Sequence, residues 1–131
     1  MWMTEVAGDH SVESIRQLSN RLMIKSRGRV IFVVVDEIDW IEAEANYLRL
    51  HLCGNVAHLS RQTMGQVTQQ LDSSCFLRIH RSFIVNVSRI REVQPTGRGD
   101  FVVVLRDGKE LPCSRSYRHA LRALYSQAGK G

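Results

Sequence analysis

The sequence predicts a mostly β domain, with antiparallel sheets of about eight to ten short strands and two or three short peripheral helices. Strand-like patterns dominate between residues 29 and 113, where apolar side chains alternate with polar ones or form short β-branched runs. Short turns rather than helical crossovers connect these segments, so neighbouring strands should be antiparallel. With 131 residues, the chain is long enough for one domain with a core and too short for two.

A helix is predicted near the N-terminus, within a linker that precedes the domain. Apolar residues recur there at helical spacing, and Ser11 is a suitable N-cap. This segment could act as a linker or as a dimer contact. The apolar positions are Val12, Ile15, Leu18 and Leu22.

The first strands are predicted between residues 29 and 60. The run "RVIFVVV" is β-branched and ends at Asp36-Glu37, and "NYLRLHL" (46–52) alternates cleanly between its two faces. Gly54-Asn55 then gives a tight turn into "VAHLS", which predicts a β-hairpin.

A short helix is predicted over residues 63–72, "TMGQVTQQLD". Thr63 and Gln66 have the spacing of a capping box. An apolar stripe that should face the core recurs at Met64, Val67 and Leu71.

Strands resume at Phe76, and a final helix closes the domain. Asp107-Gly108 indicates a two-residue hairpin turn between "VVVL" and "KELPC". The helix should start near "SRSY", with Ser114 or Ser116 as its N-cap. Its apolar face is Tyr117, Leu121 and Leu124. The predicted boundaries are an N-terminal linker at 1–27, the domain at 28–124 and a C-terminal tail at 125–131.

The charge of the chain is positive and unevenly distributed. Its formal net charge is +5, and 15 of its 18 basic residues are arginines. Residues 28–77 have a balance of −3, whereas residues 78–122 have a balance of +6. Arginine bonds bidentately to phosphate and guanine, so this segregation suggests a face for polyanions, although many basic domains use such charge only for solubility.

Composition argues for a cytoplasmic protein without a membrane span. No apolar run is long enough to cross a bilayer, and the N-terminus has no signal-peptide core. Cys53, Cys75 and Cys113 are an odd number without close pairing, which fits a reducing compartment. A redox role for Cys75 or Cys113 stays open.

The segment "FLRIHRSFIVN" (76–86) carries the strongest candidate binding site. Arg78 and His80 should face away from the core, and the alternation slips at Arg81 and Ser82, which indicates a bend. Three donors and a hydroxyl at a bend suit a phosphate or a base edge. A solvated strand face with arginine stems over apolar surface explains the same pattern equally well.

Two other segments offer polar groups suited to DNA. "CSRSYRHALR" places Arg115, Arg118 and Arg122 at helical spacing around a helix start, although an ordinary charged helix face is the simpler explanation. Asn46 precedes a strand and could bond adenine, yet asparagine at this place is commonly a turn residue.

Other classes of function have weaker support. A Cys75–His80 pair lacks an orienting partner and an oxyanion site, so no catalytic residue is assigned and no enzyme is expected. The positions His51, Cys53 and His58 fit no common zinc spacing, and neither a metal nor a cofactor is expected. A basic β-domain that binds an acidic protein partner or senses a ligand is the remaining alternative.

Three motifs closely resemble the LytTR-type DNA-binding domain of bacterial response regulators. They are "IDWIEAEANYLRLHL", "FLRIHRSFIVNVSRI" and "LRDGKELPCSRSYRHAL", in matching order and spacing over residues 28–124. The resemblance implies antiparallel sheets with a short helix, and loops that enter the major groove of double-stranded promoter DNA. It further implies pairs of domains on repeated sites and an upstream receiver domain under a sensor kinase. Only 27 residues precede the region 28–124, so we expect either a piece of a larger regulator or a stand-alone member.

The resemblance also assigns candidate DNA contacts by position. The first group lies in the loop after "IEAE", the second in "RIHRS", and the third in "SRSYR", where the correspondence is open by one residue. The residues are Asn46 and Tyr47 in the first group, Arg78, His80, Arg81 and Ser82 in the second, and Arg115, Ser116 and Arg118 in the third.

Overall fold

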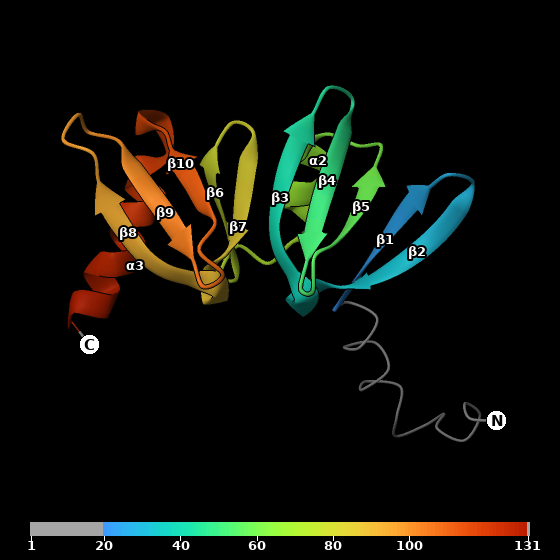
Figure 1. Ribbon diagram of the computed structural model, residues 1–131, viewed down its shortest axis with the longest axis horizontal. Coiled ribbons are helices and arrows are strands. Elements are labelled where there is room, and N and C mark those ends of the chain that lie inside the picture. Colours follow the sequence, from blue (N-terminus) through green and yellow to red (C-terminus); the bar gives the residue numbers. More distant parts are fainter. Residues whose placement is uncertain (1–19, 131) are drawn as a thin grey trace, which may run out of the picture.

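Three antiparallel β-sheets form an elongated fold (Figure 1). A computed structural model describes residues 20–130. This part of the chain contains ten strands and two α-helices, so the mostly β, antiparallel prediction is confirmed. The strands are β1 (Arg21–Ser26), β2 (Arg29–Val34), β3 (Ile38–Glu44), β4 (Tyr47–Leu52), β5 (Val56–Ser60), β6 (Phe76–His80), β7 (Phe83–Asn86), β8 (Ile90–Pro95), β9 (Phe101–Leu105) and β10 (Glu110–Cys113). The helices are α2 (Met64–Gln70) and α3 (Arg118–Lys130), with short 3-10 helices η2 (Val35–Glu37), η3 (Val87–Arg89) and η4 (Arg115–Tyr117).

The β1–β2 hairpin corrects the helical prediction at Leu22. Leu22 lies in β1 and is buried together with Ile24, two positions along the strand. Leu22 fits the apolar spacing of either a helix or a strand. Pairing with β2 favours the strand, because a paired strand buries every second side chain. The other predicted helical positions, Ser11, Val12, Ile15 and Leu18, lie outside the described residues.

The central sheet has the order β5-β4-β3-β7-β6, and α2 packs against its core. The capping box that starts α2 is confirmed: the Thr63 hydroxyl accepts from the Gln66 amide, and the Gln66 side chain accepts from the Thr63 amide. The β4–β5 hairpin is also confirmed, with Gly54 and Asn55 both at positive φ. Short-range signals therefore determined this part of the fold.

The third sheet has the order β10-β9-β8, and its β9–β10 turn differs from the prediction. The Gly108 amide donates to the Leu105 carbonyl, and the Leu105 amide donates to the Lys109 carbonyl. The loop is thus three residues long rather than two, and Gly108 takes a positive φ of 94° at its end. A turn of this kind, followed by a left-handed glycine, is the next common hairpin connection after the two-residue type.

The final helix begins differently from the prediction, although its apolar face is correct. Ser114 precedes η4 without a side-chain capping bond, and Ser116 lies inside η4. The chain then continues into α3, which extends through most of the segment predicted as a C-terminal tail. Leu121 is fully buried, with Tyr117 and Leu124 packed around it.

The β6–β7 hairpin lies between two hydrophobic cores. Phe76 and Ile84 belong to the core under α2, whereas Ile79 and Val85 belong to the core under α3. Successive side chains of a strand point to opposite faces, so this hairpin joins the two halves of the domain. Its turn is therefore held on a rigid support.

The turns fall on two opposite edges of the molecule because successive antiparallel strands reverse direction (Figure 1). On the edge that we call the tip edge lie the β1–β2, β3–β4 and β6–β7 turns, the 96–100 loop and η4. The edge that we call the far edge carries η2, the β4–β5 turn, η3 and the β9–β10 turn. No helix in the described part of the chain is long and apolar enough to span a membrane.

Candidate nucleic-acid interface

The β3–β4 turn presents the first predicted group on the tip edge. Glu44 pairs with Tyr47 across the hairpin, which leaves Ala45 and Asn46 as the two-residue loop, with Ala45 at a φ of 51°. Arg49 forms a two-pronged ion pair with Glu44, at 2.9 and 3.2 Å, and its hydrogen bond lowers the pKa of the Glu44 carboxyl. Asn46 and Tyr47 are exposed beyond this pair and are free to meet a ligand.

The β6–β7 turn separates the second predicted group into supporting and exposed residues. The Arg78 guanidinium donates to the His80 carbonyl at 3.4 Å and to the Arg81 carbonyl at 2.7 Å. His80 Nδ1 accepts from the Ser82 amide at 3.0 Å, and the Ser82 carbonyl accepts from the Ala43 amide on β3. Arg78, His80 and Ser82 thus shape the turn, whereas the side chain of Arg81 is exposed at its tip.

These two turns share one hollow, and the structure adds a residue that the sequence did not single out. The hollow is lined by the β3–β4 turn, the β6–β7 turn and the segment between β5 and α2. Arg61, from that segment, lies 5.7 Å above the ring of Tyr47. The sequence signal that could have identified Arg61 is its position just before the Thr63 cap, because a charged residue in the connection between a strand and a helix is exposed and available for binding.

The third predicted group lies on η4 and at the start of α3. The Arg115 guanidinium donates to the Arg98 carbonyl at 2.9 Å, and Arg118 donates to the Gly99 carbonyl at 3.4 Å. These bonds hold the 96–100 loop against η4, so Arg98 joins the tip edge although the sequence did not mark it. Ser116 is exposed beside them.

Arg78 links the second and third groups. Its guanidinium lies 5.5 Å from the centre of the Tyr117 ring in η4, and the Ser114 amide donates to the Ile79 carbonyl in β6. Turns that are 35 residues apart in the sequence are therefore fixed relative to each other. All three predicted groups lie along one edge, and Arg122, further along α3, is exposed.

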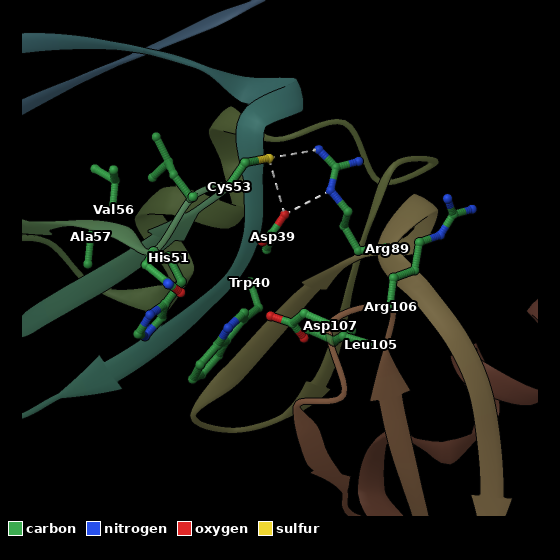
Figure 2. A pocket seen from close by; sticks show the side chains of 13 residues that line it. Asp39, Trp40, His51, Cys53, Val56, Ala57, Arg89, Leu105, Arg106 and Asp107 are labelled. Carbon is green, nitrogen blue, oxygen red and sulfur yellow. Dashed lines mark hydrogen bonds and ion pairs between the residues drawn. The ribbon is translucent and has the colours of Figure 1, made fainter.

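The far edge has a different chemistry, centred on Arg89 (Figure 2). Arg89 donates to Asp39 at 2.8 Å and to the Cys53 sulfur at 3.5 Å, and it also bonds the Asp36 carbonyl. Hydrogen bonding to Cys53, and then to Asp39, raises the pKa of Arg89. One side chain thus ties η3 to η2, β3 and the β4–β5 turn, which is a structural role.

We expect Arg89→Ala to lower the free energy of unfolding by about 1–2 kcal/mol, because partly exposed charged hydrogen bonds are lost. Arg89→Lys should recover only part of this, since an ammonium cannot reach three acceptors in the fork geometry. Urea denaturation followed by circular dichroism measures both variants. An alanine variant as stable as the parent would show that the Arg89 contacts add nothing to stability.

The residues of the rejected metal and catalytic sites do not converge. The ring of His51 stacks on the ring of Trp40, with 3.8 Å between the ring centroids, and its Nε2 atom lies 3.0 Å from a Glu42 carboxylate oxygen. Cys53 faces Arg89 instead (Figure 2). No three His, Cys, Asp or Glu side chains in residues 20–130 gather as metal ligands. Cys75 precedes β6 and contacts Ser74 and Asp72, whereas His80 ends β6, so the two do not form a pair.

The three cysteines differ in accessibility. Cys53 and Cys75 are exposed, and Cys113 is buried. Burial, with a smaller effect of the Asp100 charge, raises the pKa of the Cys113 thiol to about 11. At neutral pH this thiol is protonated, which makes it a poor nucleophile.

Comparison with known proteins places these features in one family. Residues 28–126 match the LytTr DNA-binding domain family model. A sensory transduction protein LytT of Enterococcus faecalis is 30% identical over 99 residues, which cover 76% of this chain and 40% of that protein. An uncharacterized response regulatory protein of Vibrio cholerae is 35% identical over 101 residues, covering 74% of this chain and 38% of that protein.

A solved structure agrees with the fold. It is described as the LytTr DNA-binding domain of a response regulator from Bacillus cereus, and it matches with a TM-score of 0.72 at 24% identity. The match covers 81% of this chain and 96% of that one. This chain spans about 40% of the length of the two curated relatives above. The family match, the order of the motifs and the three-sheet fold together show that the chain belongs to the LytTR DNA-binding domain family.

Proposed function

We propose that this domain binds specific sites in double-stranded promoter DNA through its tip edge and regulates transcription. The observation that carries the proposal is that the turns with the three predicted groups of contacts, from distant parts of the sequence, lie on one edge (Figure 1). Their turns are braced by Arg78, His80 and η4, so little conformational entropy is lost when they dock.

The exposed side chains suit different parts of a duplex. Arg81 has the planar fork that reads the O6 and N7 atoms of guanine, and Asn46 can pair with the N6 and N7 atoms of adenine. Arg115 and Arg118 donate to loop carbonyls, and Arg115 also lies 3.9 Å from the Asp100 carboxylate. Both guanidinium groups sit at the tip edge, and we assign them to phosphates rather than to bases. We assign Tyr47 and Ser116 to supporting contacts at the same edge.

The wider assembly is proposed by analogy with the curated relatives. The curated relatives are sensory transduction and response regulatory proteins, and they are more than twice as long as the matched part of this chain. We propose that the domain works as the output of such a regulator, with a receiver domain upstream under a sensor kinase. Two copies on repeated sites would double the number of contacts.

Fluorescence anisotropy with pooled random duplexes at several salt concentrations tests the proposal. We expect binding that weakens steeply with salt, with a slope of about −0.9 for each neutralised phosphate, and enrichment of one sequence from the bound pool. If the domain instead bound an acidic protein partner, its affinity for that partner would depend less steeply on salt and would not change when competitor DNA is added. Absence of binding even at low salt would reject the proposal.

Arg118→Gln should weaken binding to all duplexes alike and make the salt slope shallower by about one unit. The reason is that Arg118 is half-buried against the Gly99 carbonyl and contributes charge rather than a base contact. Titrations of the enriched site and of a scrambled site measure this. A loss confined to the enriched site would assign Arg118 to base reading.

A further inference from the structure

The tip of the β1–β2 hairpin carries an unusual turn. Ser26 pairs with Arg29, so Arg27 and Gly28 form a two-residue loop in which both residues have positive φ, at 52° and 78°. Turns of this type favour asparagine and glycine at both positions, because a side chain with a Cβ is strained in the left-handed region. The chain accepts an arginine where an asparagine would fit with less strain.

The charge around this turn is concentrated and positive. Lys25, Arg27 and Arg29 are all exposed. They line a hollow together with Tyr47 and Arg61, and none of the residues that line it is acidic. Three of the basic side chains come from the β1–β2 hairpin, and Arg61 comes from the segment that follows β5, a strand that β1 contacts.

This hollow continues the candidate interface. Tyr47 and Arg61 line both this hollow and the one shared by the β3–β4 and β6–β7 turns. The three groups of contacts predicted from the sequence begin at Asn46 and do not include the hairpin. The basic residues of this hollow therefore extend the tip edge beyond Asn46 and Tyr47. They extend it towards the β1–β2 hairpin, whose place beside β5 is visible in Figure 1.

We propose that the β1–β2 tip is a fourth contact of this domain with DNA, and that Arg27 and Arg29 bind phosphates flanking the sequence read by Arg81. The inference rests on the proposed function and extends it. Phosphate is the fitting ligand because the tip presents positive charge without a fixed geometry. Arg78 bonds the backbone of the Arg81 turn, but no side chain among the described residues bonds the Arg27 turn in this way. Arginines without a fixed orientation suit the phosphate backbone of DNA, because binding to phosphates depends on positive charge and not on a precise pattern of donors.

The test compares tip variants with a control variant on two lengths of duplex. Arg27→Asn removes the charge and keeps a residue that tolerates the left-handed turn, and Arg29→Gln removes the second charge. Arg21→Gln is the control, because Arg21 is an exposed arginine at the other end of the same hairpin. Thermal denaturation checks that each variant folds like the parent.

We expect the double variant R27N/R29Q to bind a site with long flanks about 3- to 10-fold more weakly at moderate salt, with a slope shallower by about two units. On a duplex trimmed to the core sequence, the double variant and the parent should bind alike. Sequence preference should not change, since phosphates carry no base identity.

Two results would overturn the inference. If R27N/R29Q behaves like R21Q on the long duplex while the parent binds normally, the tip makes no contact and the proposed function stands. If the parent itself binds no duplex at low salt, both the proposed function and the fourth contact are rejected.

Discussion

Arg81→Ala should weaken binding to the specific site by about 1–3 kcal/mol, or roughly 5- to 150-fold in Kd, if Arg81 reads a base edge. Arg81 is exposed at the tip of the β6–β7 turn. The bonds that hold the turn use its backbone carbonyl and not its guanidinium, so the substitution leaves the turn intact. The loss should appear on the enriched site and be much smaller on a scrambled duplex.

Arg81→Lys is the informative control for this effect. Lysine keeps the charge but lacks the fork that bonds guanine bidentately, so affinity for unrelated DNA should be retained while discrimination falls. Competition titrations with single-base variants of the site measure the discrimination directly. An Arg81→Ala protein with parental affinity for the enriched site would remove Arg81 from the residues that read sequence.

Asn86→Ala should lower the free energy of unfolding by about 2–4 kcal/mol, the largest stability effect that we expect of a single polar residue. Asn86 is 4% exposed, and its side-chain amide donates to the Ile38 carbonyl of β3 at 2.8 Å. Its side-chain oxygen accepts from both the amide and the hydroxyl of Ser88 at the start of η3. The substitution removes all three bonds inside the packed joint between the two cores.

Ser88→Ala separates these contributions, because it removes only the bond from the hydroxyl to Asn86 and one bond from Arg89. Its cost should be under about 1 kcal/mol, as Ser88 is exposed. Urea denaturation of both variants gives the comparison. Equal costs for the two would mean that the Asn86–Ile38 bond contributes little to stability.

Local signals account for the parts of the fold that were predicted correctly. The Thr63–Gln66 capping box and the Gly54-Asn55 turn each satisfy their own backbone within a few residues, so no distant partner is needed to interpret them. Leu22 was misassigned for the opposite reason. Its burial depends on pairing with Val33, and a single short segment cannot show that pairing.

The candidate interface shows the same division. The bend at Arg81 was visible as a slip in alternation, and the structure has a bulge between Arg78 and His80. That Arg78 and His80 brace the bend was not visible, because their acceptors and donors are backbone atoms. The loop that carries Arg98 is held at the edge by bonds from Arg115 and Arg118, which lie 17 and 19 residues away from their acceptors in the sequence.

The most direct test of the tip edge as the DNA surface removes equal charge from the two edges of the molecule. One variant is R81Q/R115Q, on the tip edge, and its matched control is R91Q/R106Q, in which both arginines are exposed at or near the far edge. Both lose two positive charges, so a general effect of net charge would be the same. We expect R81Q/R115Q to lose most specific binding to the enriched duplex in anisotropy titrations, and R91Q/R106Q to bind within about threefold of the parent. Equal losses in the two variants, or a larger loss in R91Q/R106Q, would contradict DNA binding by the tip edge.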